Sequence, residues 1–217
     1  MSGANLEALY DLGYSLSAGV LGTPYAQYRA SSANNPTDAA NLVGTIDAWL
    51  TTDPALKGTK PPQYGKPDWF AAIERAGLQA GDYLIGQNGT FIVNSLLYPQ
   101  PVALWWCNRI IGVTRPTIGN VAGVSPYSGD TTASQEPVMA GWPCFQTMVG
   151  SGSTGKPTGM KLPSDAQFPL VVFRLSLAAP LAQFNDVITD DLGRRYYAHM
   201  VDQLPLGYTI TAQQVTI

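Results

Sequence analysis

The chain has little of what most enzymes and nucleic-acid-binding proteins depend on. Its 217 residues include one histidine and two cysteines, and charged residues make up only 12% of the sequence. The 12 lysine and arginine residues cannot cover a broad phosphate-binding surface, so no specific nucleic-acid binding is expected at a formal net charge of −3. One histidine and two distant cysteines do not make a metal-ligand set, and we expect no metal and no cofactor.

Long hydrophobic runs are also missing. The longest apolar stretches, such as Pro101–Cys107, are far shorter than a membrane-spanning helix. Residues 1–20 contain Glu7 and Asp11 and lack the basic start of a signal peptide. We therefore expect a protein that is made in the cytoplasm and has no membrane partner. Cys107 and Cys144 are expected to be free and buried, with a disulfide between them as the alternative.

The residues that are plentiful indicate a folded, turn-rich chain. Apolar residues make up 45% of the sequence, and 22 glycines and 17 prolines are scattered between the apolar runs. Glycine and proline in such places mark turns rather than disorder. Soluble domains carry about 25% charged residues. A chain with so few charges is typical of a protein that hides surface in an assembly, and the alternative is an extracellular β-protein with an uncharged polar surface.

Two short segments, residues 81–93 and 185–197, follow the same pattern. In each, a small residue precedes an aspartate, an apolar run leads to a turn that ends in glycine, and the chain returns with an aromatic residue. This pattern predicts a β-hairpin that is used twice, and hence two small β-modules. We expect a valine at either turn glycine to strain the backbone and abolish assembly. The residues assigned to these structural hairpin turns are Asp82, Gly89, Asp186 and Gly193.

The expected fold is mainly β, with two small β-barrel or β-sandwich modules and an N-terminal helical or extended arm. Within the arm, residues 5–16 favour a short helix, residues 19–41 a loop, and residues 40–50 either helix or strand. The expected boundaries are 1–60 for the arm, 61–116 for the first β-module, 117–166 for a linker, strand pair and exposed loop, and 167–217 for the second β-module.

Each candidate for chemistry has a structural interpretation that fits better. His199 lies in the middle of a predicted strand, and Asp190 and Asp191 lie in a predicted hairpin turn, where aspartate is common for backbone reasons. The glycine-rich stretch 150–159 lacks the spacing of a phosphate-binding loop, because Pro157 follows its Gly-Lys pair. No catalytic, cofactor-binding or metal-binding residue is therefore assigned.

Two adjacent tryptophans allow a second interpretation. Trp105 and Trp106 lie on one predicted strand, so their side chains point to opposite faces. We expect one in the core and the other at a domain or subunit contact. The alternative is that one of them stacks on a sugar together with Tyr98, in a carbohydrate-binding module or a small envelope-directed hydrolase.

Several short motifs lie within roughly residues 60–217, namely Tyr64–Phe70, Gly81–Gly86, Gly89–Phe91, Cys107–Arg109 and Asp190–Tyr196. They resemble motifs of a group of tailed-phage virion proteins. A looser similarity is to the stopper or head-completion proteins of phage necks, which are small β-barrels with a hairpin of Asp, apolar run, turn, Gly and aromatic residue. This chain is longer, has the pattern twice and carries an N-terminal extension. The resemblance implies a non-enzymatic structural protein without catalytic residues.

The function expected from the resemblance and the composition is that of a head-to-tail connector or neck protein in the virion. Several copies would form a ring around the DNA channel and contact portal, adaptor or tail proteins. Residues 1–60 and the loops 117–136 and 149–166 would be arms that join neighbours. Buried ring contacts would explain the scarcity of charge, because charged residues are depleted from interface cores. The alternative within the virion is a tail-tip, baseplate or fibre-adaptor protein.

Overall fold

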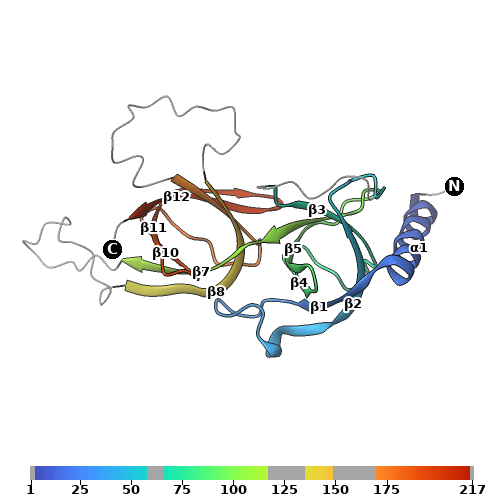
Figure 1. Ribbon diagram of the computed structural model, residues 1–217, viewed down its shortest axis with the longest axis horizontal. Coiled ribbons are helices and arrows are strands. Elements are labelled where there is room, and N and C mark those ends of the chain that lie inside the picture. The colour runs from blue at the N-terminus through green and yellow to red at the C-terminus, as the bar shows by residue number, and fades with distance from the viewer. Residues whose placement is uncertain (1–2, 58–65, 117–134, 149–169, 216–217) are drawn as a thin grey trace, which may run out of the picture.

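The chain folds into two closed, six-stranded β-barrels that lie side by side, with one helix at the outer end of the first (Figure 1). The computed structural model describes residues 3–57, 66–116, 135–148 and 170–215. Barrel 1 is built from β1 (Thr23–Tyr28), β2 (Leu42–Thr51), β3 (Asp68–Ile73), β4 (Tyr83–Gly86), β5 (Gly89–Ser95) and β6 (Val102–Cys107). Barrel 2 is built from β7 (Arg109–Pro116), β8 (Gln135–Met148), β9 (Leu170–Leu175), β10 (Val187–Asp190), β11 (Arg195–Leu204) and β12 (Gly207–Val215).

The two barrels have the same topology. The strand order around barrel 1 is β1-β2-β3-β6-β5-β4, and around barrel 2 it is β7-β8-β9-β12-β11-β10. Each barrel closes by pairing its first strand with its fourth, β1 with β4 and β7 with β10. All pairings between neighbouring strands are antiparallel in both barrels. The expectation of two small β-modules with an N-terminal helix is confirmed, and both modules are barrels.

A second core lies between the barrels and explains the continuous apolar runs of β4, β5 and β6. In these strands alternate residues face the interior of barrel 1, as Leu84 and Phe91 do. The residues between them face barrel 2 and join its core cluster. A strand that is buried on both faces has no polar face, and its sequence reads as a short unbroken apolar run. The side chains that barrel 1 contributes to the shared core are Tyr83, Ile92, Trp105 and Cys107.

A single residue, Asn108, joins the last strand of barrel 1 to the first strand of barrel 2. Its side chain bonds both ways with the backbone of Gln146, donating at 2.9 Å and accepting at 2.7 Å. Its backbone N–H donates to the carbonyl of Cys144 at 3.0 Å. Further contacts cross the interface elsewhere, where the Tyr83 hydroxyl donates to the Pro143 carbonyl at 3.1 Å. The joint is therefore anchored to β8, and the barrels are packed against each other around it.

Helix α1 (Gly3–Leu21) lies at the far end of barrel 1, away from barrel 2 (Figure 1). It begins earlier and ends later than the expected helix at 5–16. Its last turn packs closely on β2, where Ala18 is buried. Gly22 is the first residue after the helix. A Cβ on Gly22 would lie 2.9 Å from the backbone of Ala48, so only glycine allows this approach. Within the described ranges, no helix combines the length and hydropathy that a bilayer span needs.

The expected domain boundaries were wrong at three places. Residues 23–28 and 42–51, assigned to the arm, are strands of barrel 1, and residues 109–116, assigned to the first module, are the first strand of barrel 2. The strand pair expected within 138–149 is instead one long strand, β8. The reason is that each barrel begins with two strands that lie far ahead of its repeated hairpin in the sequence, β1 and β2 in barrel 1 and β7 and β8 in barrel 2. The hairpin pattern alone does not locate these strands. Most of the loops expected at 117–136 and 149–166 lies outside the described residues.

Candidate assembly site

The carboxylate of Asp82 is the centre of a polar cluster at the seam where barrel 1 closes. Its side chain is 2% exposed. Arg29, directly after β1, donates two hydrogen bonds of 2.8 Å to the two carboxylate oxygens. Gln27 donates another of 2.7 Å, and the backbone N–H of Gln79 one of 2.9 Å. The hydrogen bonds that Arg29 makes to Asp82 raise the pKa of Arg29 above its usual value. The cluster thus holds the closing strand pair together.

Asp186 occupies the same place in barrel 2, with a side chain that is 1% exposed. Arg115, near the end of β7, donates two hydrogen bonds of 2.9 Å to its carboxylate. The backbone N–H of Gln183 donates one of 2.6 Å. Here too the hydrogen bonds to the aspartate raise the pKa of the arginine. Two arginine–aspartate pairs with the same bidentate geometry therefore staple the two barrel seams.

The backbone around the two aspartates is also the same. In each barrel the aspartate carbonyl accepts a hydrogen bond from the returning strand, at 2.8 Å from Val93 and at 2.9 Å from Ala198. The residue before the aspartate has positive φ in both, +95° at Gly81 and +68° at Asn185. Glycine and asparagine are the residues that adopt this conformation most readily. The repeated sequence pattern therefore marks a repeated structure, in which the aspartates bind arginine and backbone.

The two turn glycines differ more than their equal spacing from the aspartates suggests. Gly89 has a φ of +112°, pairs with Gly86 at the start of β5, and would bring a Cβ to 3.0 Å from the indole nitrogen of Trp106. Asn88, just before it, does not have a positive φ. Gly193 has a φ of +76° in a longer turn, and a Cβ there would meet open space. The two positions therefore tolerate side chains differently.

Asp190 organises the longer turn of barrel 2. One of its oxygens accepts the backbone N–H groups of Leu192 at 3.0 Å and Arg194 at 2.9 Å, and the other accepts from the Arg194 side chain at 2.7 Å and the Tyr196 hydroxyl at 3.1 Å. Burial alone would raise the pKa of this carboxyl, but the hydrogen bonds from Arg194 and Tyr196 outweigh burial and lower it. The turn interpretation of Asp190 is confirmed, and Asp191 lies 3.9 Å from Arg109 across the same surface.

The remaining candidates for chemistry occupy structural positions. His199 is exposed on β11, with its ring nitrogen 3.3 Å from the Gln213 side chain. Trp105 is buried in the shared core beneath the guanidinium of Arg174, 5.6 Å from the ring centroid. Trp106 is partly exposed and lies against Gly89. The expectation that one tryptophan lies in the core is confirmed, and this core is also the contact between the barrels.

Cys107 and Cys144 are both free and both buried in the shared core, as expected. Desolvation raises the pKa of the Cys107 thiol, and it raises the pKa of Cys144 as well. A thiol reacts as its thiolate, so burial and a raised pKa make these two cysteines unreactive.

Helix α1 is fastened to barrel 1 by a polar and aromatic cluster around Arg75, which we call the latch. The Arg75 guanidinium lies 4.1 Å from the ring centroid of Tyr98 and 5.3 Å from that of Tyr14 on the helix. Its Nε lies 3.7 Å from the carboxylate of Asp11, which also accepts a hydrogen bond from the Tyr98 hydroxyl. The Tyr14 hydroxyl donates to the Pro99 carbonyl at 2.7 Å. The latch contacts one face of the helix.

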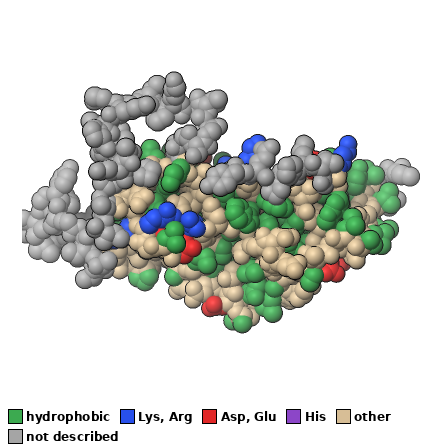
Figure 2. Space-filling view, in the orientation of Figure 1, with side chains coloured by type: hydrophobic (Ala, Val, Ile, Leu, Met, Phe, Trp, Pro, Cys, Tyr) green, Lys and Arg blue, Asp and Glu red, His purple; other side chains and the backbone are tan. Residues whose placement is uncertain are grey.

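The other faces of α1 carry large apolar side chains that remain exposed. Figure 2 shows hydrophobic side chains gathered at the end of the molecule where Figure 1 places α1, on a face with few charges. A contiguous exposed apolar surface on a soluble chain indicates an interaction site. The exposed apolar residues of the helix are Leu6, Leu9, Tyr10, Leu12, Leu16, Val20 and Leu21.

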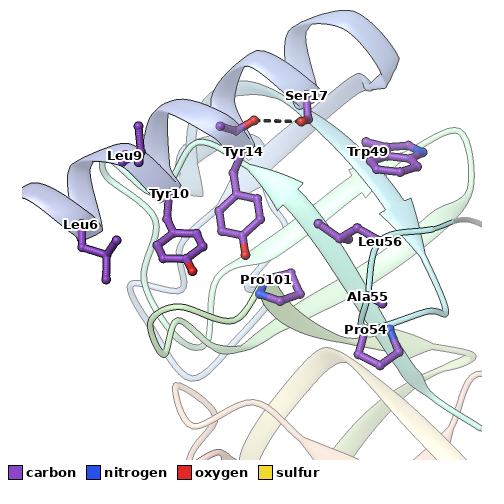
Figure 3. A pocket seen from close by; sticks show the side chains of 11 residues that line it. Leu6, Leu9, Tyr10, Tyr14, Ser17, Trp49, Pro54, Ala55, Leu56 and Pro101 are labelled. Atoms are coloured by element: carbon purple, nitrogen blue, oxygen red, sulfur yellow. Dashed lines mark hydrogen bonds between the residues drawn. The ribbon is translucent and has the colours of Figure 1, made fainter.

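A groove of about 660 Å³ runs between α1 and the rim of barrel 1. In Figure 3, Tyr10 and Tyr14 point from the helix toward Pro101, and Trp49 and Leu56 lie on the barrel side. The described residues that line the groove are uncharged. Sequence reasoning assigned this region to an arm but missed the groove, since its two walls come from segments far apart in the chain.

Searches of protein-family models, of curated proteins and of solved structures found no match to this chain. Among the described residues, no group of three or more His, Cys, Asp or Glu side chains is placed to hold a metal ion. The candidate site is therefore defined by the geometry of this chain alone: the exposed face of α1, the groove beside it, and the rigid double barrel that presents them.

Proposed function

We propose that the chain is a non-enzymatic structural component of a tailed-phage virion, and that it serves as a head-to-tail connector in a ring around the DNA channel. The observation that carries an assembly role is the exposed apolar surface of α1. Val20 is 81% exposed and Leu16 62% exposed, on a helix that the latch holds in place. A single chain in solution gains nothing from such a surface, whereas a subunit of an assembly buries it.

The use of the carboxylates supports a structural role. Asp82 and Asp186 each bind an arginine and a backbone N–H, and Asp190 binds the turn around it. A catalytic carboxylate needs an open side toward substrate, but these three side chains are at most 2% exposed. The carboxylates of Asp82 and Asp186 accept hydrogen bonds that close the barrels, and that of Asp190 accepts hydrogen bonds that shape a hairpin turn.

The virion assignment itself is supported by the resemblance of residues 60–217 to tailed-phage structural proteins. The residues that carry it near Asp82 and Asp190 fall on the two hairpins that organise the barrels. Two β-barrels joined by one residue make a stiff subunit, which suits a ring that must keep a channel open. The carbohydrate-binding alternative is less well supported, because Trp105 is buried and Tyr98 stacks on Arg75 in the latch.

The test is to locate the protein on purified particles from a culture that produces it, by gold-labelled antibody in electron microscopy and by mass spectrometry of the particle proteins. Gold at the head–tail junction is the expected result. Gold at the distal end of the tail would favour the tail-tip or baseplate alternative. Particles that form without the protein and carry no gold would overturn the virion assignment.

A further inference from the structure

Helix α1 has two apolar stripes that border each other at Leu9. One stripe lines the groove beside barrel 1, and Leu6, Leu9, Tyr10 and Gly13 belong to it. The other consists of Leu12, Leu16 and Val20, which we call the ridge. Residues four apart lie on the same face of a helix, so the three ridge side chains form a continuous line. They are 56%, 62% and 81% exposed.

The ridge points away from the barrel to which its own helix is fastened. The residues that attach the helix, Asp11, Tyr14 and Ala18, lie on the face opposite the ridge when positions are placed at 100° intervals. The ridge therefore faces away from its own barrel while the latch holds the helix in place. Among the described residues, none of this chain fills the groove or covers the ridge.

We propose that the ridge of one copy docks in the groove of the next copy. Both surfaces are uncharged: residues 12–22 contain no Asp, Glu, Lys or Arg, and the described groove lining contains none. A partner that presents charge would lose solvation at this contact and gain no ion pair. A second copy instead offers an apolar ridge that suits an apolar groove. In this way the chain provides both halves of the contact.

The geometry makes this contact heterologous. A ridge that meets a groove joins two different surfaces, so each copy can use its ridge toward one neighbour and its groove toward the other. Contacts of this kind continue from copy to copy and close into a ring when the rotation between copies allows it. The inference thus rests on the proposed ring function and names the surfaces that would build the ring.

The size of the contact predicts how it behaves in solution. The ridge runs from Leu12 to Val20, about 14 Å of the helix, and half the surface of a cylinder about 10 Å across covers about 210 Å² over that length. The two sides together bury about 420 Å², far below the roughly 1,200–2,000 Å² of stable interfaces. Two free copies should therefore associate weakly, whereas a closed ring is stabilised because each copy makes the contact twice.

Disulfide trapping between two differently tagged full-length chains tests the docking. One chain carries Leu16→Cys on the ridge and the other Ala55→Cys on the groove wall, where both side chains are exposed. The native cysteines do not interfere, because both are buried. We expect the mixed product to exceed each self-linked product at least fivefold across a concentration series. The control replaces the ridge cysteine by Leu192→Cys, which is 59% exposed on barrel 2.

Two results would overturn the inference. One is a mixed yield no higher than that of the Leu192→Cys control at every concentration. The other is a dominant Leu16→Cys self-linked product, which would indicate a symmetric helix-to-helix dimer. As a second measurement, Leu16→Asp should abolish self-association in sedimentation velocity, while Leu192→Asp should leave it unchanged. Circular dichroism checks that both variants stay folded.

The docking and the virion role fail in distinguishable ways. A protein found in particles but giving no mixed cross-link would overturn the docking and leave the virion role standing, with a different virion protein in the groove. A protein that cross-links as expected but is absent from particles would support the docking and remove the virion role.

Discussion

Barrel 1 and barrel 2 share their topology and their stapled seams, and they differ where their neighbours differ. Barrel 1 lies between α1 and barrel 2, so it is covered at both ends (Figure 1). Its Asp82 has one side-chain partner more than Asp186, the amide of Gln27. Its hairpin turn is shorter than that of barrel 2, because the last strand pair is Gly86 with Gly89 in barrel 1 but Thr189 with Arg195 in barrel 2. The shared features are those that close a barrel, whereas the differences lie where the two barrels have different neighbours.

The positions before the two aspartates illustrate this rule. Both need positive φ, but barrel 1 uses Gly81 and barrel 2 uses Asn185. A Cβ on Gly81 would lie 3.0 Å from the Ser176 hydroxyl oxygen and 3.2 Å from the Ala178 methyl group. Ser176 also donates a hydrogen bond of 2.9 Å to the Gly81 carbonyl. The contact with barrel 2 thus leaves little room for a side chain at position 81, whereas the equivalent position in barrel 2 carries the side chain of Asn185.

The largest expected effect comes from removing the seam aspartates. Asp82→Ala should lower the free energy of unfolding by about 3 kcal/mol and Asp186→Ala by about 2 kcal/mol, since each change removes charge-assisted hydrogen bonds to a buried carboxylate and Asp82 has one more. Denaturant unfolding measures both values. Asp47→Ala, at an exposed aspartate of β2, is the control. Equal losses at the two seams would mean that Gln27 contributes nothing.

The next largest effect should be a difference in stability between valine variants of the two turn glycines. Gly89→Val should cost about 2–3 kcal/mol, because the positive φ is strained and the branched side chain meets Trp106. Gly193→Val should cost about 1 kcal/mol, from backbone strain alone. Thermal unfolding of both variants beside Gly44→Val tests this, since a Cβ on Gly44 meets nothing and its φ is ordinary. A costlier Gly193→Val would contradict the assignment of Trp106 as the obstacle.

An exchange of the residues before the aspartates should sharpen the comparison. Gly81→Asn should cost about 1–2 kcal/mol although asparagine occupies the equivalent place in barrel 2, because its Cβ presses on Ser176 and Ala178. Asn185→Gly should change stability by no more than about 0.5 kcal/mol. Denaturant midpoints give both values. If Gly81→Asn were neutral while Asn185→Gly was costly, barrel packing would not set this choice.

The smallest expected effect is a difference in pH dependence at the barrel 2 turn. The folded-state pKa of Asp190 is lowered, so its ionised form stabilises the fold above the usual aspartate pKa of about 4, and this contribution is lost as the pH falls through the lowered value. Asp190→Asn cannot titrate. Between about pH 5 and pH 2 its unfolding free energy should therefore fall less than that of the wild type. Parallel curves would show that Arg194 and Tyr196 do not favour the ionised carboxylate.

Local patterns in the sequence predicted much of the barrel architecture. The alternation of apolar and polar residues over Gly207–Val215 is typical of a strand, and this range is β12 in full, because its period of two places one face inward. The hairpins around Asp82 and Asp186 were recognised from their spacing. Cys107 and Cys144 were expected to be free and buried, and they are. In each case the information lies within a few neighbouring residues.

The sequence did not predict the contacts between distant segments. Arg29 lies 53 positions from Asp82, but Arg115 lies 71 positions from Asp186, so the two staples share no common spacing. Strand β1 was assigned to a loop, because Pro24 and the flanking glycines mask a strand whose partners lie far along the chain. The latch around Arg75 likewise joins a helix to residues that no local pattern connects with it.

The one-residue joint at Asn108 also decides how the two halves can change over evolutionary time. Tandem units with a flexible linker can be lost, exchanged or re-ordered one at a time. Here either half alone would expose the shared core, with Tyr83, Ile92 and Trp105 bare on one side. Selection can therefore act on the double barrel only as one unit.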